Sequence, residues 1–284
     1  MQLSRFIYDE FIYGGHLLSI GASCIALTTM LLFNLGIRFE FLVIAYLGTQ
    51  CIYVYNYYKE FDYDKICNHC RTFHMKKLFD YIPILLSIYG ILYVLLLILY
   101  GNVKSIIFGI CLLSIGLFFT IKGKDTSKNI TGFKTVYTAF SWSLLVLFTL
   151  IFYSKMLFNL SIIFFILFVF IRWIINTSLF DLKDMESDEL RELKTLPLKM
   201  GREKFLFFIQ TLNLLSIVPI LVAILFFNLP VSSIVLTLIF FYTFFYIYRL
   251  PDEKNELTKF SHIIVDGEYF FWPILLIFSF LIFN

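Results

Sequence analysis

Long apolar stretches with almost no charge recur along nearly the whole of this 284-residue chain. A helix needs roughly 20 such residues to cross the hydrocarbon core of a bilayer. The chain is also 60% hydrophobic and only 15% charged, which is too little polar surface for a water-soluble fold. We predict nine spans, at residues 14–33, 39–59, 79–100, 103–121, 133–153, 157–179, 205–228, 231–249 and 263–283.

These spans must be helices, because backbone groups that face lipid have no water to bond and are satisfied within a helical segment. A β-barrel is excluded because the apolar runs are continuous and do not alternate at period two. We therefore predict an all-α integral membrane protein with nine transmembrane helices around a central cleft. Two four-helix halves plus one further helix would form a single domain over residues 1–284.

The basic residues are distributed unevenly between the two sides of this topology. If the N-terminus is cytoplasmic, the opposite side carries only Arg38, Lys104 and Lys155, and the other loops hold almost all remaining lysines and arginines. This asymmetry follows the positive-inside rule. We predict a multi-pass protein of a prokaryotic cell membrane with its long polar loops in the cytoplasm. No nucleic-acid-binding motif accompanies the net charge of +3, so we expect no nucleic-acid partner.

The first polar motif follows the second predicted span. Asn56, Glu60 and Asp64 are spaced four residues apart. In a helix that continues out of the membrane, residues at this spacing lie on one face with a drift of about 40° per step. An amide and two carboxylates therefore converge on one side of that helix.

The second motif follows the sixth predicted span and contains Asp181, Asp184 and Asp188 at positions i, i+3 and i+7. This spacing again predicts a single helical face. Superposing the two loops pairs Glu60 with Asp184 and Asp64 with Asp188, which indicates an internal duplication. We expect Asp64 and Asp184 to lie within about 20 Å of each other, since ions that bridge them to one diphosphate span less than that.

Carboxylates crowded on one face repel each other, so a cation is their natural partner. Hard oxygen ligands at this density suit Mg²⁺, which commonly bridges carboxylates to phosphate oxygens. Basic residues near the motifs are suited to bind the remaining phosphate charge: Arg71, Lys122, Lys194 and Arg202. The alternative is that each motif is an ordinary solvated helix end of mixed charge.

With these motifs, nearly the whole chain resembles the UbiA-type intramembrane prenyltransferases. The second motif, with the following Lys194-Thr-Leu-Pro and Gly201, is similar to the family pattern. In the first motif Asn56, Asp64, Asn68 and Arg71 match that pattern. Tyr57 and Glu60 depart from it, since both stand where the family commonly has aspartate.

The resemblance implies Mg²⁺-dependent transfer of a prenyl group from an isoprenyl diphosphate to an aromatic or other polar acceptor within the membrane, in lipid or quinone biosynthesis. It implies that Mg²⁺ is held by Glu60, Asp64, Asp181, Asp184 and Asp188. The diphosphate would be bound by Arg71, Lys122, Lys194, Arg202 and Asn68. The catalytic candidates are Asn56, Asp181, Asn176 and Arg172. Asn176 and Arg172 are included because they lie one turn apart just inside the membrane, where an arginine is costly unless it serves a polar cavity.

Three other functions stay open: a catalytically degenerate lipid-binding relative, a terpene cyclase of the same type, and a transporter. A transporter would place ionisable residues near the midplane of the membrane, whereas the acidic motifs lie at the ends of helices. The expected partners are an isoprenyl diphosphate, a prenyl acceptor that the residues do not identify, and membrane lipid. Asp266 and Glu268 begin the last predicted span, and we do not assign them to the site.

Overall fold

The computed structural model describes residues 2–155 and 159–283, and the regular secondary structure of this part is helical, with no strand. The first half holds, in chain order, α1 (Gln2–Tyr13), α2 (His16–Leu32), α3 (Phe39–Cys67), α4 (His69–Leu78), η1 (Phe79–Tyr81), α5 (Ile82–Tyr100), α6 (Val103–Phe118), η2 (Phe119–Gly123), α7 (Lys124–Asn129) and α8 (Phe133–Phe152).

The second half begins with α9 (Leu160–Lys183), so residues 157 and 158 of the predicted span 157–179 lie outside the described residues. The helices that follow are α10 (Met185–Leu190), α11 (Leu196–Met200), α12 (Arg202–Leu215), α13 (Ile217–Phe226), η3 (Val231–Leu238), α14 (Ile239–Tyr248), α15 (Lys254–Phe260), η4 (Ser261–Val265) and α16 (Glu268–Phe283).

The prediction of a polytopic α-helical membrane protein is confirmed, but the count of nine spans is not. By length and composition, seven helical segments of the described residues can cross a membrane, or eight if the bent pair α1 and α2 counts as one. That pair bends by 53° at Gly15, whose φ of 86° favours glycine. The predicted span 39–59 lies within α3 but is not among the seven, because Gln50 and Asn56 interrupt its apolar residues.

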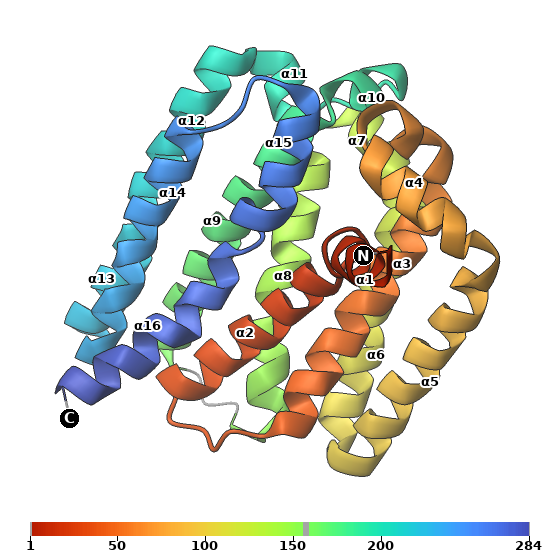
Figure 1. Ribbon diagram of the computed structural model, residues 1–284. Coiled ribbons are helices and arrows are strands. Elements are labelled where there is room, and N and C mark those ends of the chain that lie inside the picture. The colour runs from red at the N-terminus through yellow and green to blue at the C-terminus, as the bar shows by residue number, and fades with distance from the viewer. Residues whose placement is uncertain (1, 156–158, 284) are drawn as a thin grey trace.

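The helices pack as two neighbouring groups that meet at α8, α9, α2 and α16 (Figure 1). α3 packs against α2 and α5, and α6 against α8, while α9 contacts α12 and α13. The short helices α4, α7, α10 and α11 gather at one end of the molecule, and the C-terminus lies at the opposite end (Figure 1). Both acidic motifs therefore lie at the same end, as the sequence predicted.

Aromatic side chains join the two groups in the core. The rings of Trp142 on α8 and Trp173 on α9 stack with centroids 3.7 Å apart, and Tyr269 on α16 stacks on Trp173 at 4.6 Å. Contacts between aromatic rings contribute to the stability of a core together with the area that they bury. The three helices are thus held together beside the cavity described below.

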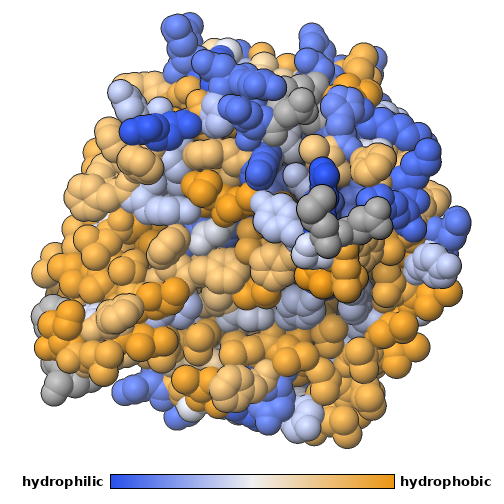
Figure 2. Space-filling model, in the orientation of Figure 1, coloured by the Kyte–Doolittle hydropathy of each residue, from blue (hydrophilic) through white to orange (hydrophobic). Residues whose placement is uncertain are grey.

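The outer surface is apolar where a soluble protein would be polar. Figure 2 shows an apolar band across the middle of the molecule, with hydrophilic side chains gathered above and below it. On α5, for example, Ile84, Ile91 and Ile98 recur every seven residues and are 58%, 67% and 60% exposed. Such exposure is stable only against lipid, which supports the membrane assignment.

Candidate active site

A cavity of about 230 Å³ lies between α3, α8 and α9 and is bordered also by α5, α6 and α10. At the end near α10 its walls carry the charged residues of both acidic motifs. Its other end is apolar and is closed by buried side chains that include Leu18, Ile44, Tyr93, Leu145 and Phe148. The cavity is therefore amphiphilic along its length.

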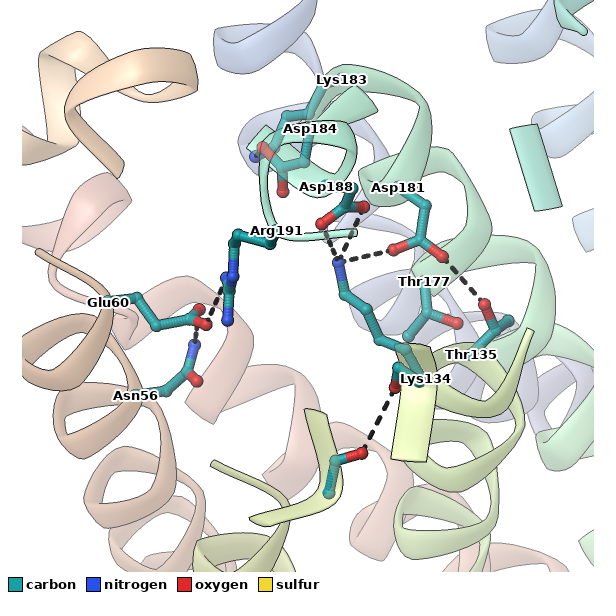
Figure 3. A network of polar contacts seen from close by, with 12 residues as sticks. Asn56, Glu60, Lys134, Thr135, Thr177, Asp181, Lys183, Asp184, Asp188 and Arg191 are labelled. Carbon is teal, nitrogen blue, oxygen red and sulfur yellow. Dashed lines mark hydrogen bonds and ion pairs between the residues drawn. The ribbon is translucent and has the colours of Figure 1, made fainter. Parts of the chain in front are cut away.

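The first motif lies on α3, which continues without a break from Phe39 to Cys67. Asn56, Glu60 and Asp64 all line the cavity, so the predicted common face is confirmed. The Asn56 amide donates a hydrogen bond to Glu60 Oε2 at 3.0 Å. Arg191, which follows α10, donates to Glu60 Oε1 at 2.9 Å and so ties the two motifs together (Figure 3).

The second motif departs from the single helix that its spacing predicted. α9 ends at Lys183, Asp184 has φ and ψ of −94° and 6°, and α10 starts at Met185. Asp181, Asp184 and Asp188 nevertheless all line the cavity. The turn at Asp184 thus aims the three carboxylates into one space from two short stretches of helix.

A lysine outside both motifs holds two of these acids. Lys134, near the start of α8, places its Nζ 2.8 Å from Asp181 Oδ1 and 3.3 Å from both carboxylate oxygens of Asp188 (Figure 3). The Thr135 hydroxyl donates to Asp181 Oδ2 at 2.9 Å. Asp181 is fully buried and Asp188 nearly so, which means that the ammonium replaces the water that these carboxylates have lost.

Asn68 connects the two motifs directly. Its amide nitrogen donates to Asp64 Oδ1 and to Asp184 Oδ1, each at 3.1 Å. The side-chain oxygen of Asn68, Oδ1, accepts a hydrogen bond of 2.7 Å from Lys183 Nζ. The same ammonium donates to Asp184 Oδ1 at 2.7 Å. Asp64 is in addition paired with Arg71. One amide bridges Asp64 and Asp184, so these carboxylates lie close together, as expected.

The cavity wall carries more acids than bases. Its lining includes six carboxylates, those of Glu60, Asp64, Asp181, Asp184, Asp188 and Asp266, and four basic side chains, those of Arg71, Lys134, Lys183 and Arg191. A diphosphate would be repelled by this wall unless further cations entered with it.

The pKa values of two of these acids respond differently to this surrounding. Burial alone would raise the pKa of Asp184, but the charges of Lys183, Lys134 and Arg71 outweigh it and hold that pKa well below its usual range. Burial raises the pKa of Asp188 to about 6, although Lys134 opposes the shift. Asp184 is therefore a permanent anion at neutral pH, whereas Asp188 takes up a proton in mildly acidic solution.

The predicted diphosphate ligands are only partly brought together. Arg71 lines the cavity, and Asn68 touches its acids. Lys122, Lys194 and Arg202 are not among the lining residues. Lys122 and Lys194 are exposed, and Arg202 pairs with Asp252 at 2.7 Å. Lys122 lies in η2, Lys194 precedes α11 and Arg202 begins α12, and none of these positions directs the side chain into the cavity.

The expectation that Arg172 lines the cavity is wrong. This residue lies one turn from Asn176, which does line the cavity, but Arg172 itself is absent from the lining. Its guanidinium is buried and pairs with Glu268, and it donates to Asn213 at 2.7 Å and to Ser216 at 3.3 Å. The cost of an arginine within a span is offset here by a buried carboxylate from α16, so no cavity is needed to explain it.

Three basic residues that line the cavity were not assigned from the sequence: Lys134, Lys183 and Arg191. Asp266 also lines it, although the sequence had placed it outside the site. Lys134 lies in α8 and Asp266 just before α16, both far along the chain from the acids that they accompany. Only the recurrence of lysine and arginine within each motif loop pointed to Lys183 and Arg191.

The donor set fits a hard divalent cation. The carboxylate and amide oxygens that line the cavity are the ligand types that Mg²⁺ prefers. In residues 2–155 and 159–283, no three acidic, histidine or cysteine side chains are already grouped as a metal site. The motif acids are instead paired with lysine or arginine, so a metal would take the place of those cations.

Comparison with known proteins agrees with this geometry. The sequence profile of the UbiA prenyltransferase family matches residues 16–275. The chain belongs to the UbiA prenyltransferase family. No protein with a curated functional description matches the sequence. Membership makes the chain a prenyltransferase by class and a multi-pass membrane protein.

Solved structures of UbiA proteins share the fold. An apo UbiA homologue from Aeropyrum pernix K1 superposes with a TM-score of 0.70 at 11% identity, covering 93% of this chain and 97% of that one. A UbiA homologue from Archaeoglobus fulgidus bound to GPP and Mg²⁺ has a TM-score of 0.65 at 14% identity, covering 94% and 99%. A structure of digeranylgeranylglyceryl phosphate synthase has a TM-score of 0.58 at 16% identity, covering 98% of each chain.

Proposed function

We propose that this protein transfers a prenyl group from an isoprenyl diphosphate to an acceptor within the membrane, in a reaction that depends on Mg²⁺. The observation that carries the proposal is the amphiphilic cavity, with six carboxylates and four basic side chains at one end and apolar side chains at the other. An isoprenyl diphosphate has the same division into a charged head and an apolar tail. The Archaeoglobus fulgidus homologue, which was solved with GPP and Mg²⁺, supports this assignment.

The excess of acids explains why cations are required. Glu60, Asp64, Asp181, Asp184 and Asp188 would hold Mg²⁺, which when bound neutralises a diphosphate and makes it a better leaving group. The four basic side chains are now paired with these acids. Once the carboxylates have other partners, Lys134, Lys183, Arg71 and Arg191 are free to bind phosphate oxygens. The ion pairs thus keep the phosphate-binding cations in position before substrate arrives.

Aromatic side chains of the cavity wall protect the reacting carbon. Tyr53, Trp142 and Phe180 line the cavity between its charged and apolar ends. Their π faces attract positive charge that develops on the allylic carbon as its bond to oxygen breaks. The Trp142 indole also donates to the Tyr53 hydroxyl at 3.3 Å, which fixes both rings. A wall of this kind excludes water that would otherwise capture the carbocation.

We further propose that the charged end of the cavity faces the cytoplasm, because the positive-inside rule assigns the basic loops to that side. Helices of both halves line the same cavity, so we infer that residues 1–284 act as one prenyltransferase-like domain. The apolar end of the cavity lies between membrane-spanning helices, so it is suited to bind the prenyl tail of a substrate dissolved in membrane lipid.

Diphosphate release measured in detergent tests the proposal. The purified protein is given dimethylallyl, geranyl, farnesyl or geranylgeranyl diphosphate with Mg²⁺ or with EDTA. We expect release only with Mg²⁺, and we expect Asp184→Ala and Asp188→Ala to abolish it while the protein stays folded. Asp252→Ala, an exposed acid outside the cavity, serves as the control.

Other outcomes identify the rival functions. Tight binding of a prenyl diphosphate without release would favour a catalytically degenerate lipid-binding protein. Release that is equal with EDTA and with Mg²⁺ would contradict the proposed metal dependence. If Asp184→Ala and Asp188→Ala lost thermal stability in proportion to activity, the acids would have a structural role instead.

A further inference from the structure

A short π-helix, η4, borders the cavity and packs against α9. In η4 the backbone N–H of Asp266 donates to the Ser261 carbonyl at 3.2 Å, five residues back along the chain. This wide turn presents both His262 and Asp266 to the cavity. The other π-helix, η2, also contributes to the cavity wall. π turns inside helices occur frequently at functional sites.

His262 has a polar atom with no partner in the described part of the chain. The side chain is only 3% exposed, and its Nε2 accepts or donates no hydrogen bond there. Buried polar atoms are nearly always hydrogen-bonded, so this nitrogen lacks a partner that the cavity can supply. The rings of Tyr13 and Phe180 pack against the imidazole at centroid distances of 5.9 and 5.3 Å, which holds its orientation.

Asp266 is the one cavity carboxylate with no lysine or arginine in ion-pair range among the described residues. Its Oδ2 lies 3.8 Å from His262 Nδ1, and its Oδ1 accepts a hydrogen bond of 3.2 Å from the Asn176 amide. The carboxyl group is therefore held beside the imidazole. A carboxylate in this position stabilises a histidine that gains a proton.

Prenyl transfer to an alcohol or a phenol leaves a proton to be removed. The allylic C–O bond breaks with its electron pair on the diphosphate, the acceptor oxygen bonds to the allylic carbon, and the hydroxyl proton must go to a base. A hydroxyl oxygen is a stronger nucleophile when a base takes its proton as it attacks, and a neutral ether forms only once that proton has been lost. The motif acids are paired with lysine or arginine, whereas His262 offers a basic ring nitrogen that has no hydrogen-bond partner among the described residues.

We propose that this corner of the cavity binds a hydroxyl-bearing acceptor and that His262 Nε2 removes its proton, so that the product is a prenyl ether. Asp266 and Asn176 are positioning residues, because they act through the imidazole. This inference rests on the proposed prenyl transfer. The other charged groups that act on His262 are Lys183 and Asp184 from the second motif and Arg71 from α4.

The experiment compares two rates in the full-length protein with Mg²⁺ and a prenyl diphosphate. One is diphosphate release without acceptor, and the other is ether formation with 4-hydroxybenzoate, a phenol, or with 1-O-hexadecylglycerol, an alcohol. We expect His262→Gln to lower ether formation at least about 100-fold more than it lowers release, the usual contribution of a general base. The wild-type rate of ether formation should rise with pH, and the variant should lose this rise.

His74→Gln is the matched control, because His74 is also a buried histidine but bonds Glu10 at 2.5 Å and does not line the cavity. Both rates should be unchanged in it. If His262→Gln does not fold, His262→Phe keeps an aromatic ring between Tyr13 and Phe180 that carries no nitrogen. Asp266→Glu should retain more ether formation than Asp266→Asn.

Three results would overturn the inference: equal loss of both rates in the His262 variants, ether formation that those variants retain, or wild-type release with neither hydroxyl compound prenylated. Absence of any Mg²⁺-dependent release in the wild type would instead refute the proposed function itself. The two failures are therefore distinguishable.

Discussion

Replacing Lys134 with methionine tests the electrostatics of the charged end. The substitution keeps the length of the side chain but removes the ammonium that lies 2.8 Å from Asp181 and 3.3 Å from Asp188. The two carboxylates are 0% and 2% exposed, so water cannot replace the lost partner. Breaking a buried ion pair in this way costs about 3–5 kcal/mol. We expect the free energy of unfolding at pH 8, without Mg²⁺, to fall by this amount.

The deficit should depend on pH and on Mg²⁺. The pKa of Asp188 is raised in the folded protein from 3.8 to about 6, so folding takes up a proton between these values. The stability that Asp188 contributes is therefore full below its ordinary pKa and is lost as pH rises through about 6. Lys134→Met should accordingly cost less at pH 5, where Asp188 is protonated. Mg²⁺ should restore more stability to the variant than to the wild type, because it replaces the missing charge.

Thermal unfolding in detergent, followed by far-ultraviolet circular dichroism, measures the effect. For 284 residues the predicted loss corresponds to a fall in Tm of about 5–8 °C, using the unfolding entropy per residue of soluble domains. Lys122→Met is the control, since this lysine is exposed and lies outside the cavity. A Tm equal to that of the wild type at pH 8, or an identical deficit at pH 5 and pH 8, would refute the reasoning.

Three further predictions concern the same cavity. Glu60→Gln should lower turnover and raise the Mg²⁺ concentration needed for half-maximal diphosphate release, whereas Asp62→Asn, an exposed acid on the same helix, should change neither; no effect of Glu60→Gln would mean that the second motif acts alone. Half-maximal activation should need more Mg²⁺ at pH 5 than at pH 7, because a proton on Asp188 competes with the metal. In Asp188→Asn the difference in Mg²⁺ requirement between the two pH values should become smaller. Tyr93→Ala should shift the preferred donor to a longer prenyl diphosphate, because Tyr93 is 2% exposed and closes the apolar end, and an unchanged preference across the donor series would show that the tail ends elsewhere.

Helical spacing predicted the site where one unbroken helix carries it. Asn56, Glu60 and Asp64 share a face of α3 because α3 continues about two turns beyond the predicted span 39–59, to Cys67. The same reasoning was wrong in detail for the second motif, since α9 ends at Lys183 and the chain turns at Asp184. The three acids of the second motif still line one cavity, because α10, which follows the turn, returns Asp188 to the cavity wall.

The cationic partners were beyond the reach of sequence patterns. Arg191 and Glu60 are 131 residues apart, and Lys134 and Asp188 are 54 apart, so only the packing of distant helices brings them together. For Arg172, the cost of burying its charge was recognised correctly, but the partner that offsets this cost is Glu268, 96 residues away. Nearness in sequence to the second motif misled for Lys194 and Arg202, whose side chains do not line the cavity.

The stack of rings that joins α8, α9 and α16 also makes the cavity visible to spectroscopy. The chain has three tryptophans, Trp142, Trp173 and Trp272, and all three belong to one cluster around Tyr269. Light that tryptophan absorbs but tyrosine and phenylalanine do not is therefore emitted from that cluster alone, although the chain also contains 18 tyrosines and 36 phenylalanines. Because Trp142 lines the cavity, a prenyl tail that enters it will replace water or void beside the indole and change the emission. The protein thus carries a label-free optical probe of its own occupancy.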